Sequence, residues 1–459
     1  MKETLVMVMA GGKGSRLAPL TSHRAKPSVP FGGRYRIIDF ALSNLVNSGY
    51  RRIFVLTQYM AHSLIQHLSR NWHLTGMGEF IEVAPAQMRL GQHWYRGTAD
   101  SVLQNLNLVR DLRPNHVAVF GGDHIYLFDV SQMDDHHRQS NADLTVAAVP
   151  VPLAEAGGFG ILVVDETGRI VGFEEKPESP TAMPGRPDMA LASMGNYIFK
   201  TKALSEALLT ETEVAGTSYD FGGDVIPRLI AEGALVQVYD YTSNKIRGAA
   251  PDAAPYWRDV GTIDSYVQAN AEARDRVPAF DLYNRSWRIR TAQRDYPPAR
   301  FVLEGGEASA LMLDSLVCEG SIIANASLTA TVIGYDCFVH HKAQLDDTIL
   351  LSGCSIGSQA SLRRVLADKN CIVDQGAQIG VDIESDRQRF PWVSPSGVVT
   401  LPKGARVPAE GPLELTPDMM FALRNDPATA SAMEEFADQI VADTSGRHSS
   451  DSAGPAQRA

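Results

Sequence analysis

A six-residue apolar step in the last third of the chain constrains the fold more than any other feature. The positions on this step, with a slip of one residue after the fourth, are Ile333, Val339, Leu345, Leu351, Ile356 and Leu362. Gly334, Gly357 and Gly380 each come directly after an isoleucine. A repeated short apolar step with turn glycines is typical of a parallel β-helix built from hexapeptides. We therefore predict a left-handed parallel β-helix over residues 301–408.

The four cysteines have a related spacing. Cys318, Cys337, Cys354 and Cys371 are separated by 19, 17 and 17 residues. Three hexapeptides make one coil of about 18 residues, so we expect these side chains near one another in successive coils. A metal or redox ladder is one interpretation. Packing in a stacked core is favoured, because free cysteine behaves as a small apolar residue and no CxxC spacing is present.

Residues 1–275 have a different pattern, in which short apolar runs alternate with helix-like stretches. The runs that predict buried strands are Leu5–Ala10, Arg52–Thr57, His116–Gly121 and Leu144–Val149. The predicted helices between them include Asp39–Ser48, His62–Ser69 and Ser101–Asp111. This alternation predicts a Rossmann-like α/β domain with a parallel or mixed sheet covered on both faces. Ligands of such sheets lie beyond the carboxyl ends of the strands.

An irregular segment, residues 276–300, separates these two patterns and is interpreted as a linker. It contains Tyr283, Trp287 and Tyr296, so we expect it to pack against the rest of the protein.

The last segment, residues 409–459, is an acidic tail. Residues 410–459 hold nine acidic and three basic side chains. Thr416 followed by Pro417 predicts a helix start, with threonine as the N-cap and proline at the first helical position. Ala428–Val441 is a candidate second helix, and the composition after Asp443 predicts disorder.

The charge balance argues against two classes of partner. The chain has 459 residues and a formal net charge of −11, which would repel nucleic acid and anionic membranes.

No apolar run approaches the ~18 residues of a membrane span. Leu5–Ala10 is followed by Gly-Gly-Lys-Gly instead of a signal-peptide cleavage site. Four cysteines do not suggest a disulfide scaffold, so we expect a cytoplasmic location.

A glycine-rich basic loop follows the first predicted strand. Gly11, Gly12 and Gly14 would let backbone amides approach an anion closely, and Arg16 could bind phosphate oxygens bidentately. Lys26 adds positive charge ten residues further on. The loop matches neither the P-loop nor the dinucleotide fingerprint. A surface turn is the alternative. It fits poorly in an acidic chain, because five basic residues lie within 21 positions: Arg16, Arg24, Lys26, Arg34 and Arg36.

Two aspartates are candidates for a metal site. Asp123 follows the run His116–Gly121, at the edge of the sheet where phosphates would bind, and Asp259 is a plausible second ligand. Two carboxylates with substrate oxygens and water would satisfy Mg²⁺. Taken alone, Asp123 could simply cap the loop after the strand, and Asp259 could pair with the adjacent Arg258.

The motifs resemble those of one family over about residues 4 to 400. The segment AGGKGSRLAPLTSHRAKPSVPFGGRYRIIDFALSNLVNSG is similar to the signature of the ADP-glucose pyrophosphorylases, which are sugar nucleotidyltransferases. The further matching segments are TQYMAHSL at 57–64, PAQMR at 85–89, WYRGTADS at 94–101, GGDHIY at 121–126, FEEKP at 173–177, SMGNYIF at 193–199 and YWRDVGT at 256–262. This set of motifs is highly specific.

The resemblance implies roles for individual residues. The implied metal ligands are Asp123 and Asp259, with Asp123, Arg16 and Lys176 as the catalytic residues. The implied nucleotide-binding residues are Gly11, Gly12, Gly14, Arg16, Lys26, Gly97 and Thr98. The implied glucose 1-phosphate contacts are Tyr95, Gly160, Glu175, Lys176 and Ser193. Without the resemblance, FEEKP at 173–177 would be interpreted as a charged edge strand.

The implied activity is that of a glucose-1-phosphate adenylyltransferase. Glucose 1-phosphate would attack the α-phosphorus of ATP with Mg²⁺ as cofactor, giving diphosphate and ADP-glucose for glycogen biosynthesis. The family is typically a homotetramer regulated by an anionic metabolite, and the residues expected at such an effector site are His23, Arg24, Arg36 and Lys369. Two alternatives are a transferase for UTP, dTTP or GTP and a non-catalytic regulatory subunit. The second is disfavoured because Asp123, Lys176, Asp259 and Arg16 are all present.

Overall fold

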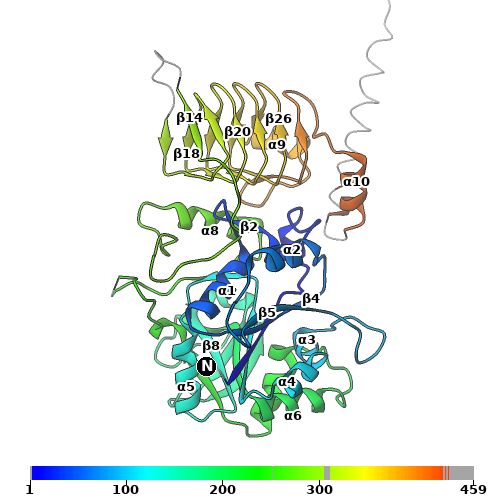
Figure 1. The fold of residues 1–459 in the computed structure, drawn as a ribbon, viewed down its shortest axis with the longest axis vertical. Coiled ribbons are helices and arrows are strands. Elements are labelled where there is room, and N and C mark those ends of the chain that lie inside the picture. Colours follow the sequence, from blue (N-terminus) through cyan, green and yellow to red (C-terminus); the bar gives the residue numbers. More distant parts are fainter. Residues whose placement is uncertain (1–2, 251, 304–310, 427–428, 431–432, 434–459) are drawn as a thin grey trace, which may run out of the picture.

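The computed structural model describes residues 3–250, 252–303, 311–426, 429–430 and 433. It consists of an α/β domain and a stack of short strands, with the linker segment between them (Figure 1). Among the described residues, no helix has both the length and the apolar character needed to cross a membrane.

The α/β domain is built on a nine-stranded sheet with β1 (Thr4–Met9) near its middle. β1 pairs in parallel with β4 (Arg52–Thr57) and β6 (His116–Gly121), and β4 pairs in parallel with β5 (Phe80–Pro85). These pairings place the carboxyl ends of β1, β4 and β6 at one edge, which is the edge that parallel sheets use for ligands.

The other half of the sheet is antiparallel around the long strand β11 (Met189–Lys200). Its partners are β6, β8 (Leu144–Pro152) and β9 (Gly160–Val164), β12 (Val236–Asp240) joins β8 in parallel, and β10 (Ile170–Glu175) forms the edge beside β9. The sheet is therefore mixed. The four strands predicted from sequence are all present, and β8 runs three residues past its predicted end.

Helices cover both faces of the sheet, and the alternation along β1 assigns the faces. Leu5 and Met7 pack in one cluster with α3 (Thr98–Leu103), α4 (Leu106–Leu112), α6 (Thr201–Glu211) and α7 (Ile226–Ala231). Val6 and Val8 pack in the other cluster with α1 (Ile37–Asn47), α2 (His62–Asn71) and α5 (Val130–Gln139). Every residue named from β1 is fully buried, as expected for a covered parallel strand.

The predicted single helix Ser101–Asp111 is wrong, because the structure has two helices, α3 and α4, that divide at Gln104 and Asn105. Asn105 donates its side-chain amide to the carbonyl of Ser101 at 2.8 Å. Such a local side-chain bond competes with the helical backbone ladder and ends it here.

The stacked strands form three parallel sheets, as in a left-handed parallel β-helix. The first sheet contains β14 (Arg300–Val302), β17 (Ile322–Ala324), β20 (Phe338–Val339), β23 (Ser355–Ile356), β26 (Ile372–Val373) and β29 (Arg406–Val407). The second contains β15 (Met312–Leu313), β18 (Ser327–Thr329), β21 (Gln344–Asp346), β24 (Ser361–Arg363) and β27 (Gln378–Ile379). The third contains β16 (Leu316–Val317), β19 (Val332–Ile333), β22 (Ile349–Leu350), β25 (Val365–Ala367) and β28 (Val399–Leu401).

The interior of this stack confirms the packing interpretation for three of the four cysteines. Cys337, Cys354 and Cys371 are free, buried and part of one hydrophobic core. Cys318 is also buried, but it lies outside this interior core and faces the α/β domain, where a Cβ on Gly33 would come within 2.6 Å of its Sγ. The thiols of Cys337 and Cys354 donate to carbonyl oxygens of the following coil at 3.4 and 3.2 Å. No group of His, Cys, Asp or Glu among the described residues could hold a metal with three ligands.

One position of the six-residue step was wrong. Leu350 lies in the interior core of the β-helix, whereas Leu351 belongs to a separate core shared with the α/β domain. The one-residue slip therefore falls after Leu345. Both leucines are buried, so apolar character alone could not distinguish the two positions.

This shared core joins the β-helix to the rest of the protein. It combines α8 (Ile263–Arg274) with Phe280 and Trp287 of the linker segment and with apolar side chains of the β-helix. Tyr296 stacks on Tyr335, with ring centroids 5.4 Å apart. Of the three aromatic residues expected to pack, Tyr283 does not, because it is 74% exposed.

Two short helices follow the later coils. α9 (Ile383–Arg389) is inserted before β28, and α10 (Pro417–Arg424) begins as predicted, with the Thr416 hydroxyl accepting from the Met419 amide. Most of the candidate second helix Ala428–Val441, and all of the segment expected to be disordered, lie outside the described residues.

Candidate active site

The glycine-rich loop connects β1 to a short 3₁₀ turn, Ser15–Leu17. Gly14 has a left-handed backbone with φ of 65°, and a Cβ placed there would lie 2.7 Å from the Cβ of Lys26. The Thr21 hydroxyl donates to the Gly14 carbonyl at 3.0 Å. Glycine is thus required at this turn for both its backbone conformation and the close approach of Lys26.

Lys26 lies between the two predicted metal carboxylates. Its Nζ is 3.0 Å from Oδ2 of Asp123 and 2.9 Å from Oδ1 of Asp259, although the lysine and Asp259 are 233 residues apart. Burial opposes the charge of Lys26, but the two carboxylates outweigh it and raise the lysine pKa. Burial likewise opposes ionisation of Asp123, but the lysine charge lowers that carboxyl pKa to about 2.

Asp259 is positioned by a two-stranded ribbon outside the main sheet. β13 (Trp257–Asp259) pairs with β7 (His124–Tyr126), which sets Asp259 directly opposite His124. Arg258 does not pair with Asp259, as the alternative interpretation supposed. It forms two hydrogen bonds with Glu272 on α8, at 3.1 and 2.9 Å. Asp259 therefore forms its ion pair with Lys26.

Arg16 reaches the same ribbon from the glycine-rich loop. A Cβ placed on Gly261 would lie 3.0 Å from Nη2 of Arg16 and 3.0 Å from Oδ2 of Asp259. The predicted anion-binding arginine therefore lies beside the predicted metal ligand.

A cleft of about 300 Å³ opens beside these charges. Most of its lining residues come from the ends of β1, β4 and β6 and from the start of α3. The full set is Met9, Ala10, Gly11, Gly12, Pro27, Leu56, Gln58, Tyr95, Gly97, Thr98, Ser101, Gly121 and Asp123. This set includes four of the seven nucleotide-binding residues predicted from sequence, whereas Gly14, Arg16 and Lys26 do not line the cleft. It also includes Tyr95, which had been expected beside the sugar.

Gln58 is a lining residue that the sequence interpretation missed. Its side-chain amide donates to the carbonyl of Tyr95 at 3.3 Å, and its carbonyl oxygen accepts from the Tyr95 amide at 2.6 Å. Gln58 comes directly after β4, whose neighbour β1 leads into the glycine-rich loop. A polar residue at the carboxyl end of a neighbouring parallel strand was the signal that could have found it.

The predicted sugar-phosphate residues gather at the edge strand β10. Glu175 pairs with Gly160 across β10 and β9, and a Cβ on Gly160 would lie 3.1 Å from Oε2 of Glu175. The exposed side chain of Lys176 forms an ion pair with Glu175. Lys176 has a left-handed backbone, with φ of 45°, which is uncommon for a residue with a side chain.

Ser193 joins this group through a tyrosine that the sequence interpretation missed. Tyr197, on the same strand β11, is buried, and its hydroxyl lies close to the Ser193 side chain. Burial raises the pKa of Tyr197, and the charges of Asp220 and Glu175 add to that rise. Ser193, Glu175 and Tyr197 are therefore neighbours.

Aromatic contacts connect the sugar side to the carboxylate side. The Trp257 ring lies 5.3 Å from the His124 ring and 5.6 Å from the Phe159 ring, measured between centroids. Trp257 is two residues from Asp259, and Phe159 precedes Gly160. The two predicted substrate regions thus lie on either side of one tryptophan.

The four predicted effector residues lie elsewhere, where the α/β domain meets the β-helix. Arg24 is buried and pairs with the fully buried Asp368 of the β-helix at 2.9 Å. Burial, followed by the charges of Arg24 and Arg36, lowers the pKa of the adjacent Lys369 to about 7. Burial also lowers the pKa of His23.

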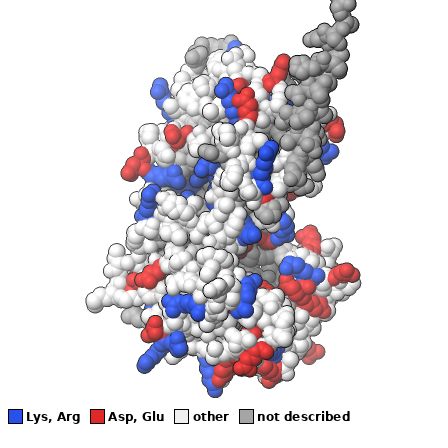
Figure 2. Space-filling model, turned by 90° about the vertical axis from the view of Figure 1, so that its right-hand side faces the viewer, with Lys and Arg blue, Asp and Glu red and all other residues white. Residues whose placement is uncertain are grey.

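This interface cation cluster comprises Arg24, Arg36, Lys369, His23, Arg294 and Lys403. The last two were not predicted, since only the fold brings them near the others. Figure 2 shows basic side chains at the level where the β-helix meets the α/β domain.

The donor set at Asp123 and Asp259 fits Mg²⁺. This ion is usually bound by one or two carboxylates, with water and substrate phosphates completing its shell. No third candidate ligand of the His, Cys, Asp or Glu type joins the pair among the described residues. In this structure the ammonium group of Lys26 lies between the two carboxylates and supplies the positive charge there.

Comparisons with known proteins place the chain in one family. A family model described as nucleotidyl transferase matches residues 5–276, and one described as GlmU-like, C-terminal hexapeptide matches residues 297–401. A glucose-1-phosphate adenylyltransferase of Aliivibrio fischeri is 44% identical over 89% of the chain and all of the relative. That of Thermus thermophilus is 48% identical over 88% of the chain and 99% of the relative. That of Cutibacterium acnes is 46% identical over 88% of the chain and 98% of the relative.

Proposed function

The chain belongs to the glucose-1-phosphate adenylyltransferases of the nucleotidyl transferase family, and from this premise we propose its reaction and the residues that carry it. The reaction joins ATP and α-D-glucose 1-phosphate to give ADP-glucose and diphosphate, as a supply of ADP-glucose for glycogen biosynthesis. The observation that carries the assignment of the site is the meeting of Lys26, Asp123 and Asp259 beside the glycine-rich loop.

The nucleotide occupies the 300 Å³ cleft, with its phosphates along the loop that contains Gly11, Gly12 and Gly14. Backbone amides at these glycines approach the phosphates closely. Arg16 and Lys26 stabilise the negative charge that grows on the leaving diphosphate. Mg²⁺, held by Asp123 and Asp259, would neutralise the repulsion between two polyanionic substrates.

Glucose 1-phosphate occupies the region around β10. Glu175 accepts hydrogen bonds from sugar hydroxyls, and Lys176 neutralises the phosphate that attacks. Gly160 leaves room for the sugar against the backbone, and Ser193 contributes a hydroxyl. The attacking phosphate is already an anion, so no residue has to remove a proton from it.

The interface cation cluster is proposed as the site of an anionic effector. Arg24 has a carboxylate partner, whereas Lys369 faces mainly other cations, and a bound anion would relieve that repulsion. We further propose a homotetramer and a cytoplasmic location, where both substrates are made.

The direct test is diphosphate release from glucose 1-phosphate and Mg²⁺ with ATP, UTP, dTTP or GTP in turn. ATP is expected to be turned over at least ~10-fold faster than the others, since only a ~1.4 kcal/mol difference in transition-state binding is required. Faster turnover with another nucleotide would reassign the base, and absence of turnover with all four would indicate the non-catalytic alternative.

A further inference from the structure

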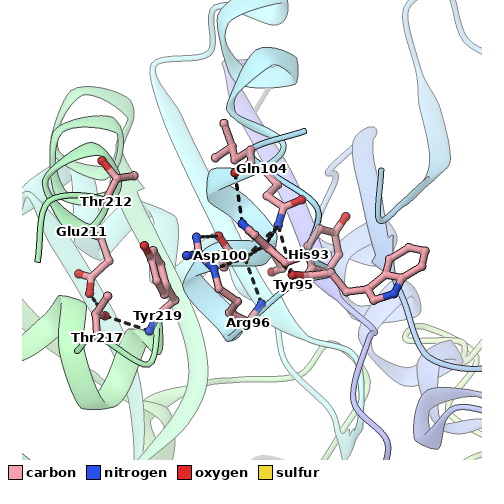
Figure 3. A network of polar contacts seen from close by, with 12 residues as sticks. His93, Tyr95, Arg96, Asp100, Gln104, Glu211, Thr212, Thr217 and Tyr219 are labelled. Atoms are coloured by element: carbon pink, nitrogen blue, oxygen red, sulfur yellow. Dashed lines mark hydrogen bonds and ion pairs between the residues drawn. The ribbon is translucent and has the colours of Figure 1, made fainter. Parts of the chain in front are cut away.

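Arg96 lies between two residues of the nucleotide cleft, Tyr95 and Gly97, but its side chain is engaged elsewhere (Figure 3). The backbone amide of Arg96 donates to Oδ2 of Asp100 at 3.0 Å, and its guanidinium donates to both carboxylate oxygens at 3.2 and 2.9 Å. Asp100 is completely buried in the first turn of α3. The fork therefore fixes the direction in which the chain enters α3.

Tyr219 supplies the other side of this contact. The Arg96 guanidinium lies over the Tyr219 ring, 3.5 Å from its centroid, in the segment that follows α6. Tyr219 is 8% exposed and has a left-handed backbone with φ of 56°. Its amide donates to the Thr217 hydroxyl at 3.0 Å, and Thr217 in turn donates to the buried Glu211. These bonds hold the ring in place despite the unusual backbone.

The two segments joined by this stack also form hydrogen bonds with each other. The Ala99 amide donates to the Tyr219 carbonyl at 2.8 Å, and the Phe221 amide donates to the Thr98 hydroxyl at 3.0 Å. A Cβ on Gly97 would lie only 2.3 Å from the Tyr219 carbonyl oxygen. Any shift of the backbone at Tyr219 therefore moves the Gly97–Thr98 wall of the nucleotide cleft.

The same segment continues to the sugar side. Asp220 accepts from the amides of Gly222 and Gly223 at 2.9 and 3.0 Å, and it also accepts from the Thr98 hydroxyl at 2.8 Å. A Cβ on Gly222 would lie 3.1 Å from Oε2 of Glu175. One short stretch of chain thus touches the nucleotide wall at Thr98 and the sugar-phosphate residue Glu175.

We propose that Arg96, Asp100 and Tyr219, here named the Arg96 clamp, set the spacing between the ATP and glucose 1-phosphate subsites. Arg96 is a positioning residue, because its guanidinium is committed to Asp100 and Tyr219 and does not face the cleft. The inference rests on the proposed function, since it concerns how the same two substrates are placed. Because one stretch of chain contacts both subsites, a substrate that orders this stretch should make the other substrate bind more tightly.

The test measures KM for both substrates, kcat and melting temperature in Arg96→Lys and Tyr219→Leu. Lysine keeps the charge but cannot form the fork or the planar stack. Both variants are expected to raise both KM values by about 10-fold, with kcat changed by less than about 3-fold. Tyr219→Phe keeps the ring and is expected to stay within about 3-fold of the wild-type KM values. The matched control, Arg110→Lys, changes an exposed arginine of α4 and should leave all parameters unchanged.

A second measurement isolates the coupling. The dissociation constant of glucose 1-phosphate is determined with and without a non-cleavable ATP analogue and Mg²⁺. The wild type should show tighter binding with the analogue, and Arg96→Lys should lose that gain. An unchanged gain in Arg96→Lys, or a rise in only one KM, would overturn the clamp. Failure of the proposed function would look different, because the wild type itself would then not turn over ATP.

Discussion

Two lysines of this protein occupy opposite electrostatic surroundings. Lys26 lies between Asp123 and Asp259, and these carboxylates raise its pKa despite burial. Lys369 lies near Arg24 and Arg36, and burial together with these charges lowers its pKa to about 7. The first region is balanced without its ligands, whereas the second carries uncompensated positive charge.

This difference in surrounding charge predicts how each region would respond to an anion. At Lys26 a phosphate has to compete with carboxylates already in place, so a divalent cation that takes over the carboxylates would free the lysine for the phosphate. At Lys369 an anion meets cations that repel one another, and it needs no metal. We therefore expect metal-dependent phosphate binding in the cleft and metal-independent anion binding at the interface.

The largest effect should come from Asp123→Asn. The change removes one proposed metal ligand and one partner of Lys26, and it should lower kcat by on the order of 10³-fold. Diphosphate release at saturating Mg²⁺ measures it. Asp111→Asn, on the exposed surface of α4, is the matched control and should keep wild-type rates. A rate for Asp123→Asn within about 3-fold of wild type would remove Asp123 from the site.

A third lysine extends the comparison to an exposed position. Lys176 has a 63% exposed side chain and one carboxylate partner, Glu175. Lys176→Ala should raise the KM for glucose 1-phosphate by about 100-fold, because a charge-assisted contact to the phosphate is lost. The KM for ATP should change far less, and Lys202→Ala on α6 serves as the control. Equal rises in both KM values would contradict a role confined to the sugar phosphate.

At the interface, Lys369→Met should weaken sulfate binding by about 10-fold, since one cation of the cluster is lost. Calorimetric titration with sulfate, without any divalent metal, measures the dissociation constant. Lys245→Met, which removes an exposed lysine elsewhere, should leave it unchanged. Sulfate affinity that requires Mg²⁺, or that survives Lys369→Met, would break the contrast between the two regions.

The smallest effect is a pH dependence of that binding. With a pKa of about 7, Lys369 is charged in the folded protein below pH 7 and neutral well above it. Sulfate affinity should therefore fall by about 3-fold or more between pH 6 and 8.5. Sulfate does not titrate in this range. In Lys369→Met the dependence should be flatter, and an unchanged slope would assign it to another group.

The same shift has a consequence for stability. The unfolded lysine keeps its proton up to its usual pKa of 10.5, whereas the folded lysine releases it near pH 7. Between these values the unfolded state binds more protons, so this group makes the free energy of unfolding rise with pH. Lys369→Met should remove that rise, as measured by chemical denaturation from pH 6 to 9.

Within the candidate site, the sequence predicted best the residues that follow the carboxyl ends of the parallel strands. The apolar runs of β1 and β6 end at the glycine-rich loop and just before Asp123, and a parallel sheet brings such ends together. The contact between Lys26 and Asp259 could not be predicted in the same way. It depends on a ribbon in which β13 returns to β7 from far along the chain.

Other prediction errors arose either between neighbouring positions of the chain or from contacts between residues that are distant in sequence. Leu351 differs from Leu350 only in the core that it faces, and apolar spacing does not report that choice. Gln58 and Asp220 became recognisable only after the fold placed them beside Tyr95 and Thr98. Periodicity thus predicted which residues are buried more reliably than which partners they meet.

The most direct test of the contrast is an anomalous difference map from crystals containing Mn²⁺ and a non-cleavable ATP analogue. A peak is expected at about 2.1 Å from oxygens of both Asp123 and Asp259. Lys26 should then have left the carboxylates for a phosphate oxygen, and no metal peak should appear near Lys369. A map with bound nucleotide but no metal at the two aspartates, and with Lys26 still between them, would contradict the account.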